Sequence, residues 1–389
     1  MPPLSRQLTS TFPPPVMAAR AWAAAAAFPP DRPLINVSQA APVDPPPPPL
    51  RQAMAQAVLE DPGAHLYGPV LGLPDLRAEV ATRWSAAYGG RIGADQVAIT
   101  SGCNQAFCAA VSSLADAGDA VLIPVPWYFN HKMWLDMAGI EARLLPCGPD
   151  MMPDPDHAAG LIDDRLRAIV LVSPNNPTGA EYPPALIAAF ADLARRHGLA
   201  LILDETYRDF LGTDGAPHGV FADDWADVLI HLYSFSKVYR LTGHRVGALI
   251  ADAARLAEIE KFLDTVAICP NQVGQRAALY GLRHMGDWVA GERLEVLRRR
   301  AAMQEALADL PGWDLLGCGA YFACVAHPFD LPSDRVAQRL VAEAGVLMLP
   351  GTMFGPPGPE ADRQMRIAFA NSDTAGIAAL AGRLRDFTP

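Results

Sequence analysis

Short apolar runs alternate with helical stretches between residues 97 and 250 of this chain. The runs are apolar throughout, which is typical of strands that are buried on both faces of a parallel sheet. Parallel strands need long crossovers, and these are usually helices. The expected strands are residues 97–100, 120–124, 168–172, 199–203 and 228–232, with 246–250 as a further candidate, and the expected helices are residues 105–117, 132–138 and 185–197. We therefore predict an α/β fold in three layers, with a mostly parallel sheet between helices.

The chain is too long for a single core. Its 389 residues exceed the size at which one hydrophobic core usually stops growing, so we expect two domains. Further helices are expected at residues 51–60, 76–88, 256–266, 293–308 and 333–344, and further strands at 321–326, 346–349 and 365–370. The pattern predicts a large domain over residues 50–275 and a smaller α+β domain over residues 276–389.

The first 49 residues are rich in proline and end in a run of five prolines. Proline fixes φ and donates no backbone hydrogen bond, so we expect an extended segment with at most one short helix near residues 15–27. The alanine-rich stretch 21–28 is similar to the apolar part of a signal peptide, but its weak hydrophobicity and internal position favour a helix. A disordered tail and an ordered arm both fit this composition. The apolar residues 34–37 favour an arm that packs with the small domain.

Charge and cysteine content limit the classes of partner. The formal net charge is −11, which disfavours nonspecific binding to nucleic acid. No apolar stretch reaches the roughly 18 residues that span a bilayer, so no membrane association is expected. The six cysteines form no C-x-x-C pair, and no cysteine–histidine cluster has zinc spacing. We expect reduced thiols in a cytoplasmic protein and no metal site.

Four polar segments follow predicted strands, where ligands bind in sheets of this kind. Residues 100–105 read TSGCNQ; their N–H groups suit an anion, although Ser101 as a simple helix cap explains the segment equally well. Residues 173–179 read SPNNPTG, a turn rich in amide groups. Residues 204–207 read DETY, in which the first carboxylate is either a helix cap or a functional group.

The fourth segment reads YSFSK at residues 233–237 and is followed by GHRVG at 243–247. A lysine beside two hydroxyl groups, with an arginine eight residues later, is compatible with a solvated loop. It is also compatible with a phosphate site that holds a reactive amine, because lysine loses its charge readily when it is desolvated or close to another cation. The residues alone leave both interpretations open.

In this order and at these spacings, NNPTG, DETY, SFSK and GHRVG resemble the fold-type I pyridoxal-phosphate enzymes, specifically the class I and II aminotransferases. The resemblance extends over nearly the whole chain. It implies that Lys237 holds pyridoxal 5′-phosphate as a Schiff base and moves a proton in catalysis. It implies that Asp204 pairs with the pyridine nitrogen, which keeps the ring an electron sink. Asn176 and Tyr207 would bind the ring oxygen O3′.

The resemblance also implies contacts to the phosphate group and to the ring face. The implied phosphate ligands are Ser234, Ser236, Arg245 and the turn Gly102, Cys103 and Asn104. Cysteine is unusual at its position if a hydroxyl is needed there, but a backbone N–H contact survives it. Tyr128 corresponds to an aromatic residue that stacks on the ring, with core packing as the alternative. Tyr67 corresponds to a tyrosine that reaches the phosphate of a neighbouring subunit, which implies a homodimer with shared active sites.

Substrate contacts follow from the same resemblance. Arg366 corresponds to the arginine that binds the α-carboxylate, with a surface arginine as the alternative. Asn176 borders the substrate as well, and Ala40 stands where the family usually has a glycine, which leaves the role of the arm open. No arginine occurs in residues 268–275, where aspartate-type enzymes bind a second carboxylate, so a dicarboxylate substrate is disfavoured. Three polar residues after the aromatic residue either line the pocket or begin a helix: Asn130, His131 and Lys132.

The sequence therefore predicts a transaminase that moves an amino group between an α-amino acid and a 2-oxo acid. Pyridoxal-phosphate lyases and oxidases that act on amino acids share these motifs, since the reaction depends on how the pocket orients the bonds at Cα. A regulatory protein on the same scaffold is disfavoured, because no basic helix-turn-helix segment precedes the body. The sequence does not identify the amino donor.

Overall fold

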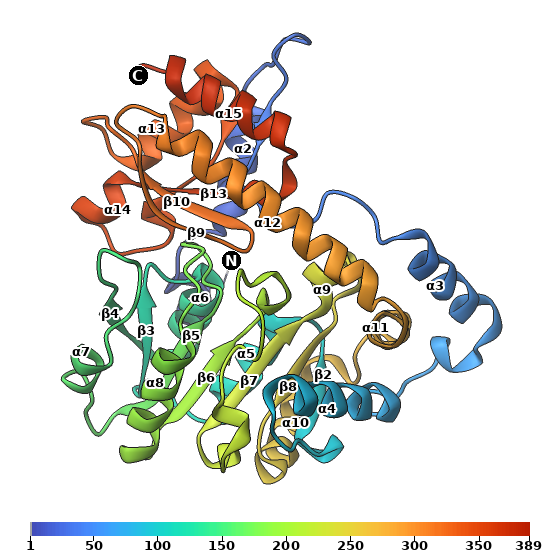
Figure 1. Cartoon of the computed structure of the whole chain (residues 1–389). Coiled ribbons are helices and arrows are strands. Elements are labelled where there is room, and N and C mark those ends of the chain that lie inside the picture. Colours follow the sequence, from blue (N-terminus) through green and yellow to red (C-terminus); the bar gives the residue numbers. More distant parts are fainter. Residues whose placement is uncertain (1) are drawn as a thin grey trace.

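A sheet of seven strands forms the centre of the larger part of the molecule (Figure 1). The computed structural model describes residues 2–389. The strands lie in the order β2-β8-β7-β6-β5-β3-β4 and are parallel, except that β8 is antiparallel to both of its neighbours. They are β2 (Val97–Thr100), β3 (Ala120–Val125), β4 (Glu141–Pro146), β5 (Leu166–Val172), β6 (Ala200–Asp204), β7 (Leu229–Ser234) and β8 (Gly247–Ile250).

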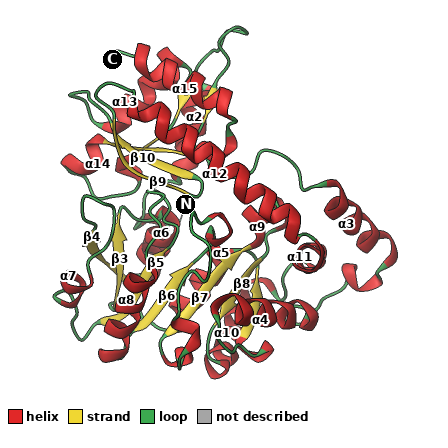
Figure 2. Ribbon diagram, viewed as in Figure 1, coloured by secondary structure: helices red, strands yellow, loops and turns green. Residues whose placement is uncertain are grey.

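Helices cover both faces of this sheet (Figure 2). They are α4 (Pro74–Tyr88), α5 (Cys103–Ser112), α6 (Phe129–Ala138), α8 (Pro184–Arg196), α10 (Ala253–Ala267) and α11 (Gln272–His284), whereas α3 (Pro48–Glu60) lies to the side and packs on α11. Alternate side chains of one strand enter two different hydrophobic cores. In β5, Ile169 and Leu171 belong to one core and Ala168 and Val170 to the other. The predicted three-layer α/β fold is confirmed, and burial on both faces explains why the strands are apolar throughout.

A smaller antiparallel sheet, in the order β12-β13-β10-β9, lies in the C-terminal part of the chain. Its strands are β9 (Asp314–Gly319), β10 (Phe322–Ala326), β12 (Leu349–Pro350) and β13 (Gln364–Ile367). It is accompanied by α12 (Gly286–Ala308), α13 (Ser333–Arg339), a π-helix (Leu340–Ala344), α14 (Pro359–Arg363) and α15 (Thr374–Asp386). A third hydrophobic core joins this sheet to α12 and α15, through residues such as Phe322, Met303 and Ile377.

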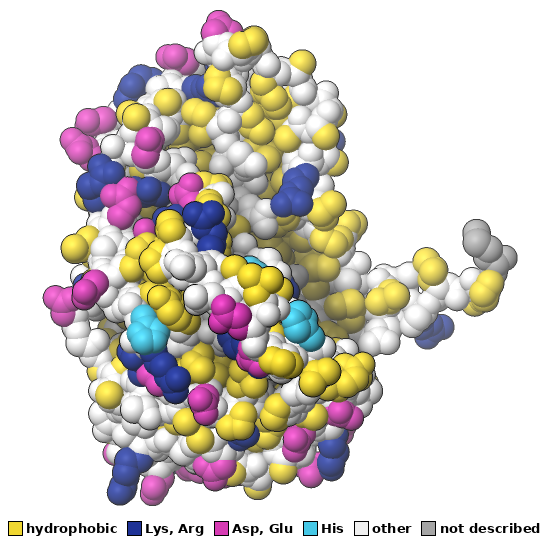
Figure 3. Space-filling view, turned by 90° about the vertical axis from the view of Figure 1, so that its right-hand side faces the viewer, with side chains coloured by type: hydrophobic (Ala, Val, Ile, Leu, Met, Phe, Trp, Pro, Cys, Tyr) yellow, Lys and Arg dark blue, Asp and Glu magenta, His cyan; other side chains and the backbone are white. Residues whose placement is uncertain are grey.

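Most of the proline-rich N-terminal segment lies along the body of the molecule. It contains α1 (Arg6–Thr9), α2 (Pro15–Ala24) and β1 (Ile35–Asn36), and β1 pairs in parallel with β11 (Val346–Leu347). The expectation of at most one short helix is wrong, because α1 forms a second one. The side chain of Ser5 caps α1 by accepting the N–H of Gln7 at 3.2 Å. Figure 3 shows the described beginning of this segment standing out from the body.

Shorter elements complete the chain. They are α7 (Pro155–Ala159), α9 (Phe235–Val238) and 3₁₀ turns at Pro62–His65, Ala94–Gln96, Arg208–Phe210, Val220–Ala222, Trp225–Asp227, Thr242–His244, Gly351–Met353 and Phe369–Asn371. Within residues 2–389, no helix combines the length and apolar character that a bilayer crossing requires.

Several elements differ from the sequence-based expectation. β4, β9, α11 and α15 were not expected, and α12 begins seven residues before the predicted start at 293. The strand expected at 346–349 is two short strands in different sheets, and the helix expected at 333–344 changes from α to π geometry. Helix α11 runs through residue 275, the predicted domain boundary, and packs on α3 and α4.

Gly179 carries a tight contact between the loop after β5 and the small sheet. It has a φ of +75°, and a Cβ atom there would lie 2.4 Å from the carbonyl oxygen of Phe322 and 2.5 Å from the backbone nitrogen of Gly319. We predict that Gly179→Ala lowers the free energy of unfolding by about 3 kcal/mol, because backbone strain and overpacking add. Gly198→Ala, at a φ of +64° with open space around it, isolates the strain alone and is expected to cost about 1 kcal/mol. Denaturant unfolding of both variants measures the difference, and equal losses would contradict the contact.

Candidate active site

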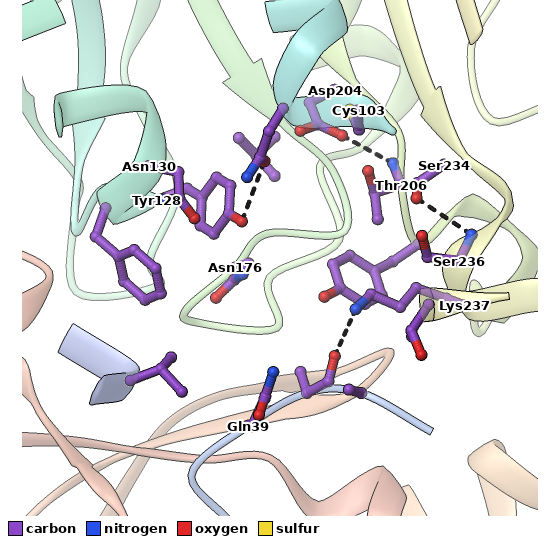
Figure 4. A pocket seen from close by; sticks show the side chains of 18 of the residues that line it. Gln39, Cys103, Tyr128, Asn130, Asn176, Asp204, Thr206, Ser234, Ser236 and Lys237 are labelled. Atoms are coloured by element: carbon purple, nitrogen blue, oxygen red, sulfur yellow. Dashed lines mark hydrogen bonds between the residues drawn. The ribbon is translucent and has the colours of Figure 1, made fainter. Parts of the chain in front are cut away.

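A cavity of about 360 Å³ lies where β5, β6 and β7 end, and residues of the N-terminal segment and of β13 close it (Figure 4). Ligands commonly bind outside the carboxyl ends of strands in open α/β sheets. The cavity brings together most of the residues that the sequence singled out: Ala40, Cys103, Asn104, Tyr128, Asn176, Asp204, Tyr207, Ser234, Ser236, Lys237, Arg245 and Arg366.

Lys237 lies in the short helix α9, directly after β7. The side chain of Ser234 caps this helix by accepting the backbone N–H of Ser236, which fixes the turn that carries the lysine. The Lys237 Nζ donates a hydrogen bond to the carbonyl oxygen of Ala40 at 2.6 Å. Burial, followed by the nearby guanidinium groups of Arg245 and Arg366, lowers the pKa of Lys237 to about 8. The neutral, nucleophilic form of this amine is therefore far more populated near neutral pH than that of an ordinary lysine.

Asp204 is the last residue of β6 and is 4% exposed. Its Oδ1 accepts the backbone N–H of Thr206 at 3.0 Å, and its Oδ2 lies 3.5 Å from Nε2 of His131. Burial opposes ionisation, but the interactions with His131 and Thr206 outweigh it and lower the pKa of Asp204. The His131 ring is held by stacking on Phe107, with ring centroids 3.7 Å apart. The site therefore contains a fixed, buried carboxylate.

The start of α5 lies beside Arg245 and several hydroxyl groups. Gly102, with a φ of +84°, is the residue that precedes the helix, so the alternative interpretation of Ser101 as the helix cap does not hold. A Cβ atom on Gly102 would lie 2.2 Å from Nη2 of Arg245, so only glycine lets the guanidinium approach this turn. Arg245 Nη1 also donates to Ser236 Oγ at 3.4 Å. First-turn N–H groups, a guanidinium and serine hydroxyls together suit a phosphate group.

Arg366 is a buried cation. It forms no ion pair with any carboxylate of residues 2–389. It is 3% exposed, and its guanidinium lies over the rings of Phe322 and Phe354, at 5.2 and 4.8 Å from their centroids. Nη1 donates to Asn176 Oδ1 at 2.9 Å, Nη2 donates to the carbonyl of Ser38, and Nε has no partner. Burial lowers the pKa of Arg366 to about 10. An unpaired buried charge is costly, so this geometry favours an anionic ligand.

The comparisons with known proteins agree with these features. Residues 32–384 match the sequence model of the family described as Aminotransferase class I and II.

The chain belongs to the class I and II aminotransferases.

Relatives and solved structures support this assignment. The chain is 31% identical to the aromatic aminotransferase ISS1 of Arabidopsis thaliana over 84% of this chain and 82% of that protein. It is 31% identical to a valine–pyruvate aminotransferase of Mycobacterium tuberculosis, over 82% of this chain and 83% of that protein. A structure of Thermus thermophilus aspartate aminotransferase with maleate superposes with a TM-score of 0.90 at 25% identity, covering 99% of both chains. The predicted family, the fold-type I fold and the predicted transaminase activity are confirmed.

Some predicted residues of this aminotransferase lie apart from the cavity lining. Tyr67 is 80% exposed and does not line the cavity of its own chain. Of the three polar residues after Tyr128, Asn130 lines the cavity, and His131 contacts Asp204. Lys132 instead contacts Asp136 within α6, so it belongs to the helix rather than to the pocket.

Sequence reasoning missed other residues of the lining. Thr206 lies within the DETY motif and Thr242 directly precedes GHRVG, so the motifs that identified their neighbours also pointed to both. Phe129 follows the predicted aromatic residue directly. Val16, from α2, is brought to the cavity by the fold of the N-terminal segment, and no motif marks it.

The pKa of Lys237 has a measurable consequence. Only the neutral amine attacks an aldehyde, so the rate at which the protein forms a Schiff base with added pyridoxal phosphate should rise with pH, reach half of its maximum near pH 8 and level off above that pH. Stopped-flow absorbance of the bound cofactor measures this rate, and Lys237→Ala is the blank. A rate that keeps rising toward pH ~10, where ordinary lysines titrate, would contradict the shift.

Proposed function

We propose that the chain is a pyridoxal-phosphate-dependent aminotransferase that uses Lys237 to move an amino group between an α-amino acid and a 2-oxo acid. The observation that carries the proposal is the shared cleft: a lysine of lowered pKa, a buried carboxylate and a buried arginine without an anionic partner all face one cavity. The relatives named above are transaminases, which favours this reaction over lyase or oxidase chemistry.

The residues of the cleft fit the cofactor. Asp204 would hold the pyridine nitrogen, and Tyr128 would stack on the ring. Burial raises the pKa of Tyr207, so its O–H stays protonated and is able to donate to O3′ together with Asn176. The phosphate would be held by the start of α5, which includes Gly102, Cys103 and Asn104, and by Ser234, Ser236 and Arg245. When bound, the cofactor supplies an aldehyde carbon and an electron-withdrawing ring that stabilises negative charge at the substrate Cα.

Lys237 is proposed to carry the proton. With a pKa of about 8, Nζ accepts a proton from the substrate Cα and returns it without a large energetic penalty in either direction. The carbonyl of Ala40 accepts a hydrogen bond from Nζ of Lys237 at 2.6 Å and holds the amine at the wall of the cavity. The N-terminal segment thus helps to position the base, and alanine in place of the usual glycine leaves this carbonyl contact intact.

Arg366 is proposed to bind the substrate α-carboxylate. Asn176 and the carbonyl of Ser38 accept hydrogen bonds from two nitrogens of the Arg366 guanidinium. The rings of Phe322 and Phe354 pack against the guanidinium and restrict its orientation. A guanidinium fixed in this way orients a planar carboxylate and, through it, the bonds at Cα.

The proposal includes a homodimer with shared active sites. Leu66, Tyr67, Val266 and Ile268 are apolar residues that are 44–80% exposed. The backbone N–H of Gly68 contacts Sγ of Cys269 at 3.4 Å, which brings the two exposed segments together. We propose that a second copy covers this patch and that Tyr67 reaches the phosphate site of the partner.

We also propose a location in the cell and a division of the chain into domains. We propose a cytoplasmic protein, in keeping with six cysteines that form no disulfide in the structure. We also propose three parts: an arm over residues 1–49 that packs with the small domain, a large cofactor-binding domain over 50–275, and a small domain over 276–389. The pairing of β1 with β11 supports the placement of the arm.

Release of 2-oxo acid from an amino acid tests the reaction. With purified holoenzyme, we expect release in step with consumption of an added 2-oxo acid acceptor, and no sustained release without one. Continued release without an acceptor would indicate a lyase or an oxidase instead. Lys237→Ala is expected to lose nearly all turnover, on the order of 10⁴-fold or more, because both the covalent attachment and the base are removed.

Replacement of the arginine tests the carboxylate contact. We expect Arg366→Ala to raise KM for α-amino acid donors by about 100-fold, the loss of a charge-assisted bidentate contact. Cofactor binding should be retained, because Arg366 is not among the residues that are proposed to hold the cofactor. Steady-state kinetics across several donors provides the measurement, and an unchanged KM for every donor would remove Arg366 from the site.

A further inference from the structure

The cavity has charged groups for the cofactor and the α-carboxylate and none beyond these. Its charged lining residues are Asp204, Lys237, Arg245 and Arg366. Under the proposed function, on which this inference rests, the first three hold the pyridine nitrogen, the aldehyde carbon and the phosphate. Arg366 holds the α-carboxylate. No charged residue of the described lining is left to pair with a charge on the substrate side chain.

The opposite wall of the cavity is uncharged. Figure 4 shows Tyr128 and Asn130 across the cavity from Ser236 and Lys237. Phe129, beside them at the start of α6, is buried and packs on Phe354, with ring centroids 5.6 Å apart. Phe354 also lies against Arg366, so the wall adjoins the carboxylate site.

Val16, from α2, also lines the cavity and packs on the hydrophobic core that contains Phe129 and Phe354. The N-terminal segment is fixed to α6 just before this residue, because Ser10 Oγ donates to the carbonyl of Asp136 at 2.9 Å and Thr11 Oγ1 donates to Oδ2 of Asp136 at 3.1 Å. Val16 therefore belongs to an anchored wall of the cavity rather than to a loose terminus.

The charged groups near this wall lie outside the cavity lining. Lys132 is paired with the carboxylate of Asp136, and Arg20, an exposed side chain, donates to Oε1 of the neutral Gln39 at 2.8 Å. Four exposed side chains that a second copy would bring are apolar: Leu66, Tyr67, Val266 and Ile268. A charged side chain placed here would lose its hydration without gaining an opposite charge, which is strongly unfavourable.

We infer that the amino donor has an uncharged, largely apolar side chain, and that Val16, Phe129 and Asn130 form its side-chain subsite. Phe129 and Val16 supply apolar surface, and the amide of Asn130 is the polar group at the wall. The α-carboxylate at Arg366 and the side chain at this wall then set the substrate in one orientation.

A donor panel tests the substrate class. The holoenzyme is assayed with pyruvate as acceptor and methionine, leucine, phenylalanine, aspartate, glutamate, lysine or arginine as donor. We expect kcat/KM for the best uncharged donor to exceed that for each charged donor by on the order of 100-fold. A charged donor within tenfold of the best uncharged one would overturn the inference while leaving the proposed function intact. The absence of turnover with all donors would instead contradict the proposed function.

Two substitutions locate the subsite. Val16→Arg and Asn130→Arg each place a guanidinium at the wall, and each is expected to raise the ratio of kcat/KM for glutamate over methionine by at least about tenfold. The control Met17→Arg adds the same charge one residue further along α2, at a side chain that is 58% exposed and outside the lining, and should leave the ratio unchanged. Bound-cofactor absorbance verifies folding. An unchanged ratio in both wall variants, or an equal shift in Met17→Arg, would place the subsite elsewhere.

Discussion

Burial of both faces of the seven-stranded sheet is the constraint on which the site depends. Side chains of β5, β6 and β7 alternate between two hydrophobic cores, so the faces of the sheet are almost entirely apolar, and the buried His231 of β7 is accommodated by its contact with Glu205. Functional side chains are therefore confined to the strand ends, where the chain leaves the sheet. Asp204 is the last residue of β6, and Lys237 follows β7 within three residues. The adjacency of two parallel strands places the carboxylate and the amine in the same cleft.

The charge balance of the cleft is opposite to that of the whole chain. The chain carries a formal net charge of −11, whereas three cations and one carboxylate line the cavity. The excess positive charge suits a ligand with a phosphate group and a carboxylate. It also keeps the amine of Lys237 less basic than an ordinary lysine, because guanidinium groups add to the effect of burial. The net charge of a chain mainly reflects its solvated surface. In this chain it does not predict the charge of the cavity lining.

The sequence predicted the elements that local pattern controls. The apolar strands at the centre of the sheet and the motif residues at their ends were identified, because burial and turn chemistry leave a direct imprint on residue type. β4 was missed because it lies at the sheet edge, where Glu141 is exposed and Arg143 is half-buried, so the apolar pattern is broken. α11 was missed because it contains Gly274 and Gly281, which weaken a helical pattern. Both glycines serve close packing: a Cβ atom there would meet Val246 and Tyr239. Val16 could not be placed, since its position depends on how the arm folds back over the body.

The arm and the last strand of the small sheet meet at the cavity although 328 residues separate Ser38 from Arg366 in the sequence. During synthesis on the ribosome, β1 has no partner until residues 346–347 have emerged. The large sheet, by contrast, is complete once residue 250 has been made. The nascent chain thus contains the proposed cofactor ligands of its large sheet well before Arg366, the proposed carboxylate ligand, is made, so a product truncated between them would keep the former and lack the latter.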